Sequence, residues 1–246
     1  ELTKYNIKTF EKIYKSAGEK FYKDFYIRKK TNNIFISSKL ATSKDLFISN
    51  KYKKWITNVY SRGRVHLLRA SHDCILTTSK TILKDNSTLN CRIDGLQKYS
   101  PKRFIIDKNL SIPIKSKIIK TANKISTFVF YNLIDNFKLK KLKQHKVKTI
   151  RIDLKDNHLD FNKIIIFLRN KGFYRVFVEA GIKFNNFLLE NNYINDFYHF
   201  YSDELFGYKN FHNAKSFLKK MNKIKRSKRE IKINLFQDKL IKYLIK

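Results

Sequence analysis

The chain has 246 residues, of which 42% are hydrophobic and 15% aromatic, enough to bury the core of one large domain. With 6 glycines and 2 prolines, its composition excludes a disordered or low-complexity protein. The formal net charge of +34 attracts polyanions in general, but the cations are spread over the whole length, among the abundant Asn, Ile, Phe and Tyr typical of an AT-rich genome, so we expect no specific nucleic-acid partner.

Neither a membrane span nor a secretion signal is visible in the sequence. No run of about 18 apolar residues occurs, and the first residues lack the charged-then-apolar-then-small order of a signal peptide. The two cysteines, Cys74 and Cys91, form no CxxC motif and have no adjacent pair of histidines. We therefore predict a cytoplasmic protein without a metal site, in which both cysteines are small packing residues.

The first 30 residues are predicted to be a linker and a helix that leads into the fold. Four apolar residues recur there at helical spacing: Ile7, Phe10, Ile13 and Tyr14. The chain does not start with methionine, and its only methionine is Met221. We therefore expect a further region upstream, and we place the main domain at residues 31–246.

The next part of the sequence alternates strands and helices. Residues 34–41 alternate apolar and polar side chains, as a half-buried strand does. A helix capped by Thr57 is expected next, followed by a short strand at 73–77. One of two hydroxyl residues, Thr78 or Ser79, then caps a short helix.

The alternation continues through the second half of the chain. Further strands are expected at residues 103–107, 127–131, 148–153, 174–179 and 196–201. Asp160 opens a helix with an apolar face, and Gly172 stands at the position where such a helix ends. Another helix is expected at residues 184–191.

The tail is predicted to form two strands, at 230–236 and 239–245, after a solvated basic loop at 219–229. Strands alternating with helices predict an α/β fold, with a mixed, mostly parallel sheet, helices on both faces and an antiparallel C-terminal edge. The absence of a GxGxxG segment excludes the Rossmann fingerprint.

Five segments follow one another in an order that one protein family shares. They are Lys39-Leu40-Ala41, Trp55-Ile56-Thr57, a predicted helix ending in Leu68-Arg69-Ala70, the pattern Thr81-x-x-x-Asp85-x-x-x-Leu89-x-x-Arg92, and Val178-Glu179-Ala180-Gly181. This series resembles the reductase domain of the bacterial bifunctional riboflavin-biosynthesis deaminase/reductase. The resemblance extends from residue 20 to residue 240.

The resemblance implies a fold of the dihydrofolate-reductase type and one reaction. The reaction is the NADPH-dependent reduction of 5-amino-6-(5-phosphoribosylamino)uracil, in which hydride adds to the opened ribosyl side chain and yields the ribitylamino product. The expected partners are this phosphorylated pyrimidine and, because family members associate through their reductase domains, a second copy of the chain. The region upstream would be the family's zinc deaminase, whose His-x-Glu and Pro-Cys-x-x-Cys motifs do not occur here.

The resemblance also assigns roles to individual positions. Those that match substrate-binding positions are Lys53, Arg69, Leu89, Arg92 and Glu179. Those that match NADPH-binding positions are Thr42, Trp55, Thr81, Asp85, Gly181, Ile182, Lys183, Phe184 and Asn185. We expect Glu179 to be the catalytic acid/base and Lys39 to be the cation beside the sugar. Two positions have structural alternatives, since Arg69 could offset a helix dipole and Trp55 could be a core residue.

Several positions depart from the family's pattern. A turn that normally contains glycine has Leu46, so we expect its shape to differ. Lys53 and Lys108 each replace a serine; the first could still grip a phosphate, and the second could meet the 2′-phosphate of the cofactor. These departures leave two alternatives open: a related NADPH reductase of another pterin-like or phosphorylated substrate, and a noncatalytic basic binding module.

Overall fold

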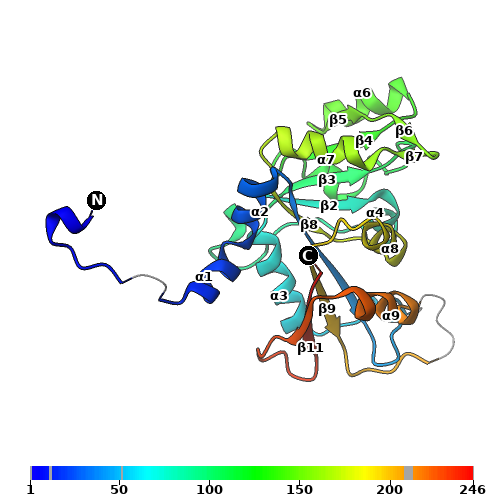
Figure 1. Cartoon of the computed structure of the whole chain (residues 1–246). Coiled ribbons are helices and arrows are strands. Elements are labelled where there is room, and N and C mark those ends of the chain that lie inside the picture. Colours follow the sequence, from blue (N-terminus) through cyan, green and yellow to red (C-terminus); the bar gives the residue numbers. More distant parts are fainter. Residues whose placement is uncertain (1, 11–12, 51, 208–212, 246) are drawn as a thin grey trace.

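A mixed β-sheet organises the computed structural model, which describes residues 2–10, 13–50, 52–207 and 213–245 (Figure 1). In sheet order, the strands found in these residues are β10 (Ser227–Glu230), β11 (Lys239–Leu244), β9 (Asp196–Tyr201), β1 (Phe35–Thr42), β8 (Arg175–Val178), β2 (Cys74–Thr78), β3 (Lys102–Ile106), β4 (Thr127–Tyr131) and β5 (Lys148–Arg151). All neighbours from β9 to β5 pair in parallel, whereas β11 and β10 pair antiparallel. The predicted mostly parallel sheet with an antiparallel C-terminal edge is confirmed.

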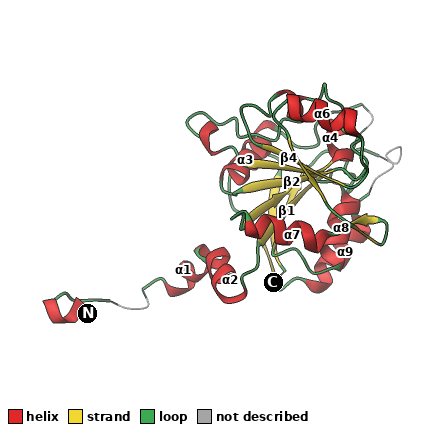
Figure 2. Ribbon diagram, turned by 90° about the horizontal axis from the view of Figure 1, so that it is seen from above, coloured by secondary structure: helices red, strands yellow, loops and turns green. Residues whose placement is uncertain are grey.

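Helices cover both faces of the sheet, as predicted (Figure 2). They are η1 (Leu2–Tyr5), α1 (Lys15–Phe21), α2 (Lys23–Thr31), α3 (Val59–Ala70), α4 (Ser79–Asp85), η2 (Gln97–Tyr99), α5 (Lys117–Lys120), α6 (Asn136–Gln144), α7 (Phe161–Asn170), α8 (Ile182–Glu190) and α9 (Lys215–Ile224). A small hairpin of β6 (Leu154–Lys155) and β7 (His158–Leu159) precedes α7. None of the described helices is both long and apolar enough to cross a bilayer.

Two hydrophobic layers, one on each face, hold the helices against the sheet. Successive strand residues enter opposite layers, so that Phe104 packs with the residues of α7, α8 and α9, whereas Ile105 packs with those of α3 to α6. Phe104 is fully buried and stacks on Phe128, with ring centroids 4.4 Å apart. Cys74 and Cys91 are free and buried, which confirms that both are packing residues.

Side-chain caps begin two of the helices at the places where the sequence pattern predicts a start. Thr78 caps α4, and Asp160 caps α7, each accepting a backbone N–H of the first turn. Gly172 follows α7 with φ +81, a conformation that glycine adopts without strain. The predicted cap Thr57 is wrong by one residue, because the Asn58 side chain accepts the N–H of Ser61 and starts α3.

The N-terminal segment differs from its prediction. Residues 7–10 are not helical, and the apolar residues expected on a helix there are exposed, Phe10 by 78% and Tyr14 by 83%. After the short 3-10 helix η1, helical structure resumes only at α1 and α2, and the segment before them extends away from the sheet (Figure 1). Helical spacing alone was insufficient because no core faces these side chains.

The basic stretch at 219–229 is not a loop, so that prediction is wrong. Its first half continues the amphipathic helix α9, in which Phe217, Leu218 and Met221 are buried. Its second half includes β10, which therefore lies earlier than the predicted strand at 230–236. The chain leaves the extended conformation after β10, and Phe236 adopts φ +55.

The buried face of α9 yields a test of the fold. We expect Phe217→Ala to lower the free energy of unfolding by about 3–5 kcal/mol, because it leaves a cavity between α9 and β9, where Phe217 packs edge-on against Phe197. Lys219→Ala on the exposed side of the same helix should change it by less than about 0.5 kcal/mol. Urea denaturation measures both values, and equal small effects would contradict the buried position of Phe217.

Candidate active site

A buried carboxylate and guanidinium pair lies at the carboxyl edge of the parallel strands. Glu179 directly follows β8, and Arg69 lies in the last turn of α3. Arg69 Nε donates to Glu179 Oε1 at 2.6 Å, and Nη2 donates to Oε2 at 3.0 Å. The side chains are only 10% and 7% exposed. This two-point pairing satisfies both groups away from water, and it shows that Arg69 does more than offset a helix dipole.

Lys39 contributes a second cation to the same carboxylate. It extends from β1, which pairs in parallel with β8, and its Nζ lies 3.6 Å from Glu179 Oε2. The Lys39 side chain is 25% exposed, so the cluster reaches solvent through this ammonium group. Three residues that the sequence assigned to substrate or catalysis therefore lie together: Lys39, Arg69 and Glu179.

The two cations keep Glu179 ionised. Burial by itself would raise the pKa of this carboxyl, but the charges of Arg69 and Lys39 and the hydrogen bonds from Arg69 outweigh it and lower the pKa to about 2. At neutral pH the group carries no proton to donate. The geometry therefore supports a role for Glu179 in holding Lys39 and Arg69 in place.

The loop that contains Leu89 and Arg92 is attached to this cluster. Arg69 Nη1 donates to the backbone oxygen of Asn90 at 2.9 Å. Leu89 is buried, with φ +51, so its side chain belongs to the core. Arg92 is exposed, and among the described residues its Nη1 bonds only neutral oxygens of Thr88 and Asn90, at 3.1 and 3.3 Å. Arg92 therefore presents its charge to solvent, whereas that of Arg69 is already matched by a carboxylate.

His66 belongs to this cluster, although the sequence reading did not select it. It lies one turn before Arg69, and its Nδ1 is 2.9 Å from the same Asn90 oxygen. Burial and the charges of Arg69 and Arg92 lower the pKa of His66 to about 4, so its ring is neutral at physiological pH. The spacing of three residues to Arg69 on one helix face was the signal that could have identified it.

The residues assigned to the nicotinamide cofactor lie around the same edge in different environments. Trp55 is 54% exposed, with the Arg62 guanidinium 5.0 Å from its ring centre, so it is not a core residue. Thr42 is fully buried, and its hydroxyl is bonded to His199. Thr81 lies in the first turn of α4, where its backbone N–H donates to the Thr78 hydroxyl.

Asp85 ends α4 on the side of the cluster. The surrounding chain partly removes its carboxyl from water, which raises its pKa, although the nearby charges of Lys39 and Lys84 act in the opposite direction. Glu179 adds to the rise. Asp85 is thus a surface residue whose carboxyl is partly shielded from water, and its pKa is raised beside the cluster.

The first turn of α8 follows Glu179 directly and contains the remaining cofactor positions: Gly181, Ile182, Lys183, Phe184 and Asn185. Gly181 is the N-cap and contributes no side chain, so the backbone at this helix start stays accessible. Asn185 is fully buried, and its amide donates to the oxygens of Ala180 and Gly181 at 3.0 and 3.3 Å. These hydrogen bonds from the buried side chain stabilise the turn before α8.

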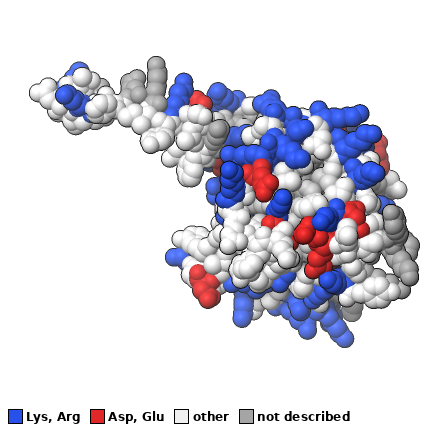
Figure 3. Space-filling view, turned by 90° about the horizontal axis from the view of Figure 1, so that it is seen from below, with Lys and Arg blue, Asp and Glu red and all other residues white. Residues whose placement is uncertain are grey.

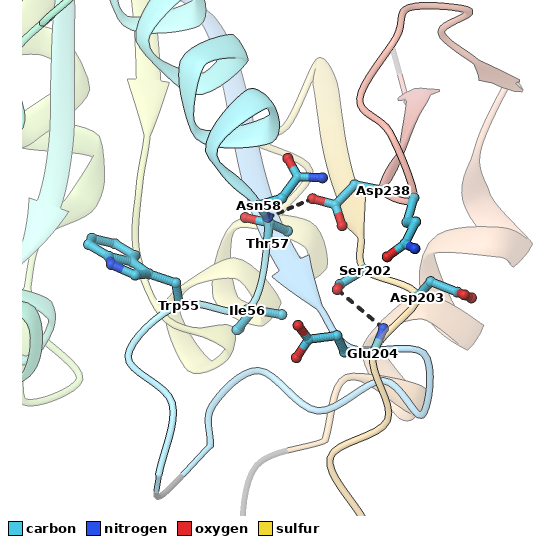
Figure 4. Close-up of a pocket in the computed structure, with 9 residues that line it drawn as sticks. Trp55, Ile56, Thr57, Asn58, Ser202, Asp203, Glu204 and Asp238 are labelled. Atoms are coloured by element: carbon cyan, nitrogen blue, oxygen red, sulfur yellow. Dashed lines mark hydrogen bonds between the residues drawn. The ribbon is translucent and has the colours of Figure 1, made fainter.

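Lys53 does not join the cluster. Its Nζ bonds Glu204 Oε2 at 2.6 Å, beside a cavity of about 210 Å³ lined by residues 55–58, 202–204, 237 and 238 (Figure 4). In this view the Trp55 ring points away from the carboxylates of Glu204 and Asp238. Neither this cavity nor a second one of about 290 Å³ at the amino ends of the strands includes Glu179.

Two departures from the family's pattern have a defined structure. Leu46 adopts φ +67, so its turn has the left-handed conformation for which glycine is the usual residue, without glycine being present. Lys108 Nζ donates to the backbone and side-chain oxygens of Asn157, at 2.9 and 2.8 Å. Leu46 therefore adopts a left-handed backbone conformation that is uncommon for a residue with a side chain, and the Lys108 ammonium has neutral partners.

The chain is similar to proteins of riboflavin synthesis. A family model described as "RibD C-terminal domain" matches residues 35–230. A relative named 5-amino-6-(5-phosphoribosylamino)uracil reductase, from Buchnera aphidicola, is 33% identical over 161 residues, which cover 60% of this chain and 73% of the relative. The riboflavin biosynthesis protein RibD of Actinobacillus pleuropneumoniae is 22% identical over 74% of this chain, which spans only 48% of that protein.

Solved structures share the fold. RibD of Acinetobacter baumannii superposes with a TM-score of 0.72 at 20% identity, over 93% of this chain and 62% of that one. The riboflavin biosynthesis reductase Rib7 of Saccharomyces superposes with a TM-score of 0.66 at 20% identity, over 93% of this chain and 99% of that one. The sheet and helices described above therefore recur in these proteins.

The low pKa of Glu179 predicts an acid-dependent stability. Because its folded-state pKa, about 2, lies below the ordinary 4.5, its pairing stabilises the fold above pH 4.5, and this stability is lost as the pH falls toward 2. We expect Glu179→Gln to lower the free energy of unfolding by about 3 kcal/mol at neutral pH. The difference from wild type should shrink as the pH falls below 4.5.

Urea denaturation at a series of pH values measures this difference. The matched control is Glu190→Gln, since Glu190 also pairs with a lysine, Lys220, but at an exposed position. That variant should differ from wild type by less than about 1 kcal/mol at every pH. A Glu179→Gln difference that stays constant from neutral pH to about pH 3 would contradict the depressed pKa.

Proposed function

The chain belongs to the family of RibD C-terminal domains, and from this membership we propose that it is the NADPH-dependent 5-amino-6-(5-phosphoribosylamino)uracil reductase of riboflavin biosynthesis. The observation that supports this function most directly is the cluster of Lys39, Arg69 and Glu179, which joins three positions assigned to substrate and catalysis at the carboxyl edge of the sheet. In open α/β sheets this edge is where ligands bind.

Three basic residues have separate tasks in this proposal: two belong to the cluster, and Arg92 lies on the loop attached to it. Arg69 is fully engaged with Glu179 and the loop, so it positions other groups. Arg92, with only neutral partners for its Nη1, binds the phosphate of the substrate. Lys39, held by Glu179 and partly open to solvent, lies beside the sugar oxygens. This division assigns the substrate's charge to an arginine that has no competing carboxylate among its hydrogen-bond partners in the described part of the chain.

The cofactor positions can hold a dinucleotide. The backbone at the start of α8 favours a phosphate, and the exposed Trp55 ring with the nearby cations of Arg62 and Lys54 offers a surface for an aromatic and anionic molecule. When bound, the reduced nicotinamide supplies the hydride. Thr42 is fully buried and bonded to His199, so its side chain would support this site from the core.

Reduction of the opened sugar also needs a proton. Hydride adds to the imine carbon, and the nitrogen or the departing ring oxygen takes up a proton. Glu179 has none to give, because its pKa is about 2. We assign this proton to Asp85, a carboxyl beside the cluster whose pKa is raised by burial, and Lys39 lowers the energy of the negative charge that forms on oxygen.

The protein's wider setting is part of the proposal. The chain spans about half the length of the RibD proteins that it matches, 48% for Actinobacillus and 46% for Chlamydia pneumoniae. We propose that residues 1–30 link the reductase domain, residues 31–246, to an upstream deaminase region. We also propose that the protein acts in the cytoplasm as a homodimer and uses NADPH.

A second candidate is a related reductase that acts on another phosphorylated substrate. It is favoured by Lys53, which replaces a serine at a substrate position and bonds Glu204 outside the cluster. A basic binding module receives less support, because on the face in Figure 3 the cations are interspersed with carboxylates and form no continuous stripe.

Activity of Lys39 variants tests the function. Anaerobic oxidation of NADPH, followed by absorbance with the freshly prepared substrate, should be catalysed by the wild type. Lys39→Met should reduce kcat/KM by about 100-fold or more, because the cation beside the sugar is lost. Lys53→Met serves as the control and should change it by less than about threefold, since its ammonium is bound by exposed Glu204.

The outcomes separate the two candidates. NADPH binding by the wild type without turnover would favour a different phosphorylated substrate. Absence of both binding and turnover would contradict the reductase function. A larger loss in Lys53→Met than in Lys39→Met would move the substrate site to the cavity beside Glu204.

The proton donor has its own test, the pH dependence of kcat. Because the acid form of Asp85 is required, kcat should decrease as the pH rises through the raised pKa of this carboxyl. Asp85→Asn should lower kcat by about 100-fold and abolish this decrease. An Asp85→Asn profile that keeps the wild-type shape would assign the proton to another group, and unchanged NADPH binding in the variant would show that the cofactor site is intact.

A further inference from the structure

Arg103 is a fully buried cation that has no part in the proposed reductase chemistry. It lies on β3, among the residues of the layer that contains Ile105 and Ile118. In the described part of the chain its guanidinium forms no ion pair with a carboxylate. Burial lowers its pKa to about 10, so it remains charged at neutral pH. A buried, unpaired charge is retained only when its hydrogen bonds are well satisfied.

Neutral oxygens satisfy all three nitrogens of this guanidinium. Nε and Nη2 donate to the Thr127 hydroxyl at 3.0 and 2.6 Å, and Nη2 also donates to the backbone oxygens of Ile118 and Ile125 at 3.0 and 2.9 Å. Nη1 donates to the Thr121 hydroxyl at 2.8 Å and to the Thr88 backbone oxygen at 2.9 Å. A lysine has no planar fork and cannot reach these acceptors together.

The acceptors of Arg103 lie in the segment 118–127, with the exception of the Thr88 oxygen, which belongs to a different loop. Thr88 directly precedes Leu89, which has φ +51, and the Arg92 guanidinium rests on the Thr88 hydroxyl. Arg103 therefore fixes the backbone from which Arg92 extends. Two further contacts hold the loop of residues 86–92. Arg69 donates to the backbone oxygen of Asn90, and the Asn86 side chain accepts the N–H of Lys117.

We propose that Arg103 is a positioning residue for the substrate. Its hydrogen bond to the Thr88 oxygen fixes the loop 86–92 from the core side. It thereby holds the Arg92 guanidinium where it can bind the phosphate of the substrate. This inference rests on the proposed function for the identity of the substrate. The loop is thus held by two arginines, Arg69 from the active-site side and Arg103 from the core, and neither of them needs to touch the phosphate.

The first test compares KM with kcat. In Arg103→Lys, which keeps the charge, KM for the phosphorylated substrate should rise by roughly tenfold, while kcat and the Kd for NADPH change by less than about twofold. Leu142→Ala is the control, because it opens a cavity in the same hydrophobic layer without altering a hydrogen bond to the loop. It should lower the melting temperature and leave KM unchanged. Equal KM values in Arg103→Lys and wild type would overturn the proposal.

Coupling to Arg92 separates positioning from general stability. If Arg103 acts through Arg92, then adding Arg103→Lys to Arg92→Ala should raise KM by less than about twofold beyond the single Arg92→Ala variant. If the two substitutions instead multiply, Arg103 acts by another route and the proposal fails.

Amide hydrogen exchange provides a readout that does not depend on the reaction. Arg103→Lys should accelerate exchange in residues 86–92 by at least about tenfold relative to β8. If the wild type shows no turnover, the proposed function fails, whereas unchanged exchange with normal turnover overturns only the role of Arg103. Should Arg103→Lys not fold, Thr127→Val removes two of its contacts and should produce a smaller change in the same direction, and its absence would contradict the proposal.

Discussion

The structure of this site depends on Glu179, a buried carboxylate that is paired with two cations. Glu179 is 6% exposed, and it remains ionised only because Arg69 and Lys39 surround it. An isolated charge at this depth would be very unfavourable, so the three residues must be present together. The pairing joins the end of β8 to the last turn of α3 and to β1, segments that are far apart in the chain.

The parallel sheet explains why these groups meet. β1, β8 and β2 are neighbours, and their carboxyl ends lie at one edge, so Lys39, Glu179 and the segment after Thr78 are brought to the same place. The same edge receives the start of α8, whose backbone is open at Gly181. A site that binds a phosphorylated sugar and a dinucleotide needs cations and helix starts at one location, and this topology supplies both.

The sequence predicted the regular part of this architecture and the identity of the central residues. Alternating strands and helices gave the sheet, because hydrophobic patterns reflect burial on its faces. Lys39, Arg69 and Glu179 were selected from family-like segments, but their mutual pairing was not, since Arg69 and Glu179 are 110 residues apart and no local pattern records a contact across the sheet. The protonation of Glu179 could not be predicted from a local pattern either, because it depends on these two partners.

Other errors also have physical causes. The many lysines around α9 led to the prediction of a loop. Three apolar residues on one face of the helix are nevertheless enough to pack it against the sheet. The alternating residues 231–235 resembled a strand, but Leu235 is buried and its backbone oxygen accepts the Asn58 amide, so the chain turns there. For Lys53 the sequence could not predict the bond to Glu204, which is distant in sequence and determines where the ammonium lies.

A direct titration tests whether Glu179 is a permanent carboxylate that positions two cations. Carbon-13 NMR of protein labelled at the glutamate carboxyl carbon, with Glu179→Gln used to assign the signal, follows the protonation of this one group. We expect an ionised signal down to at least about pH 3, consistent with a pKa of about 2. A midpoint above 5 would show that Glu179 holds a proton near neutral pH, and it would restore this residue as the catalytic acid.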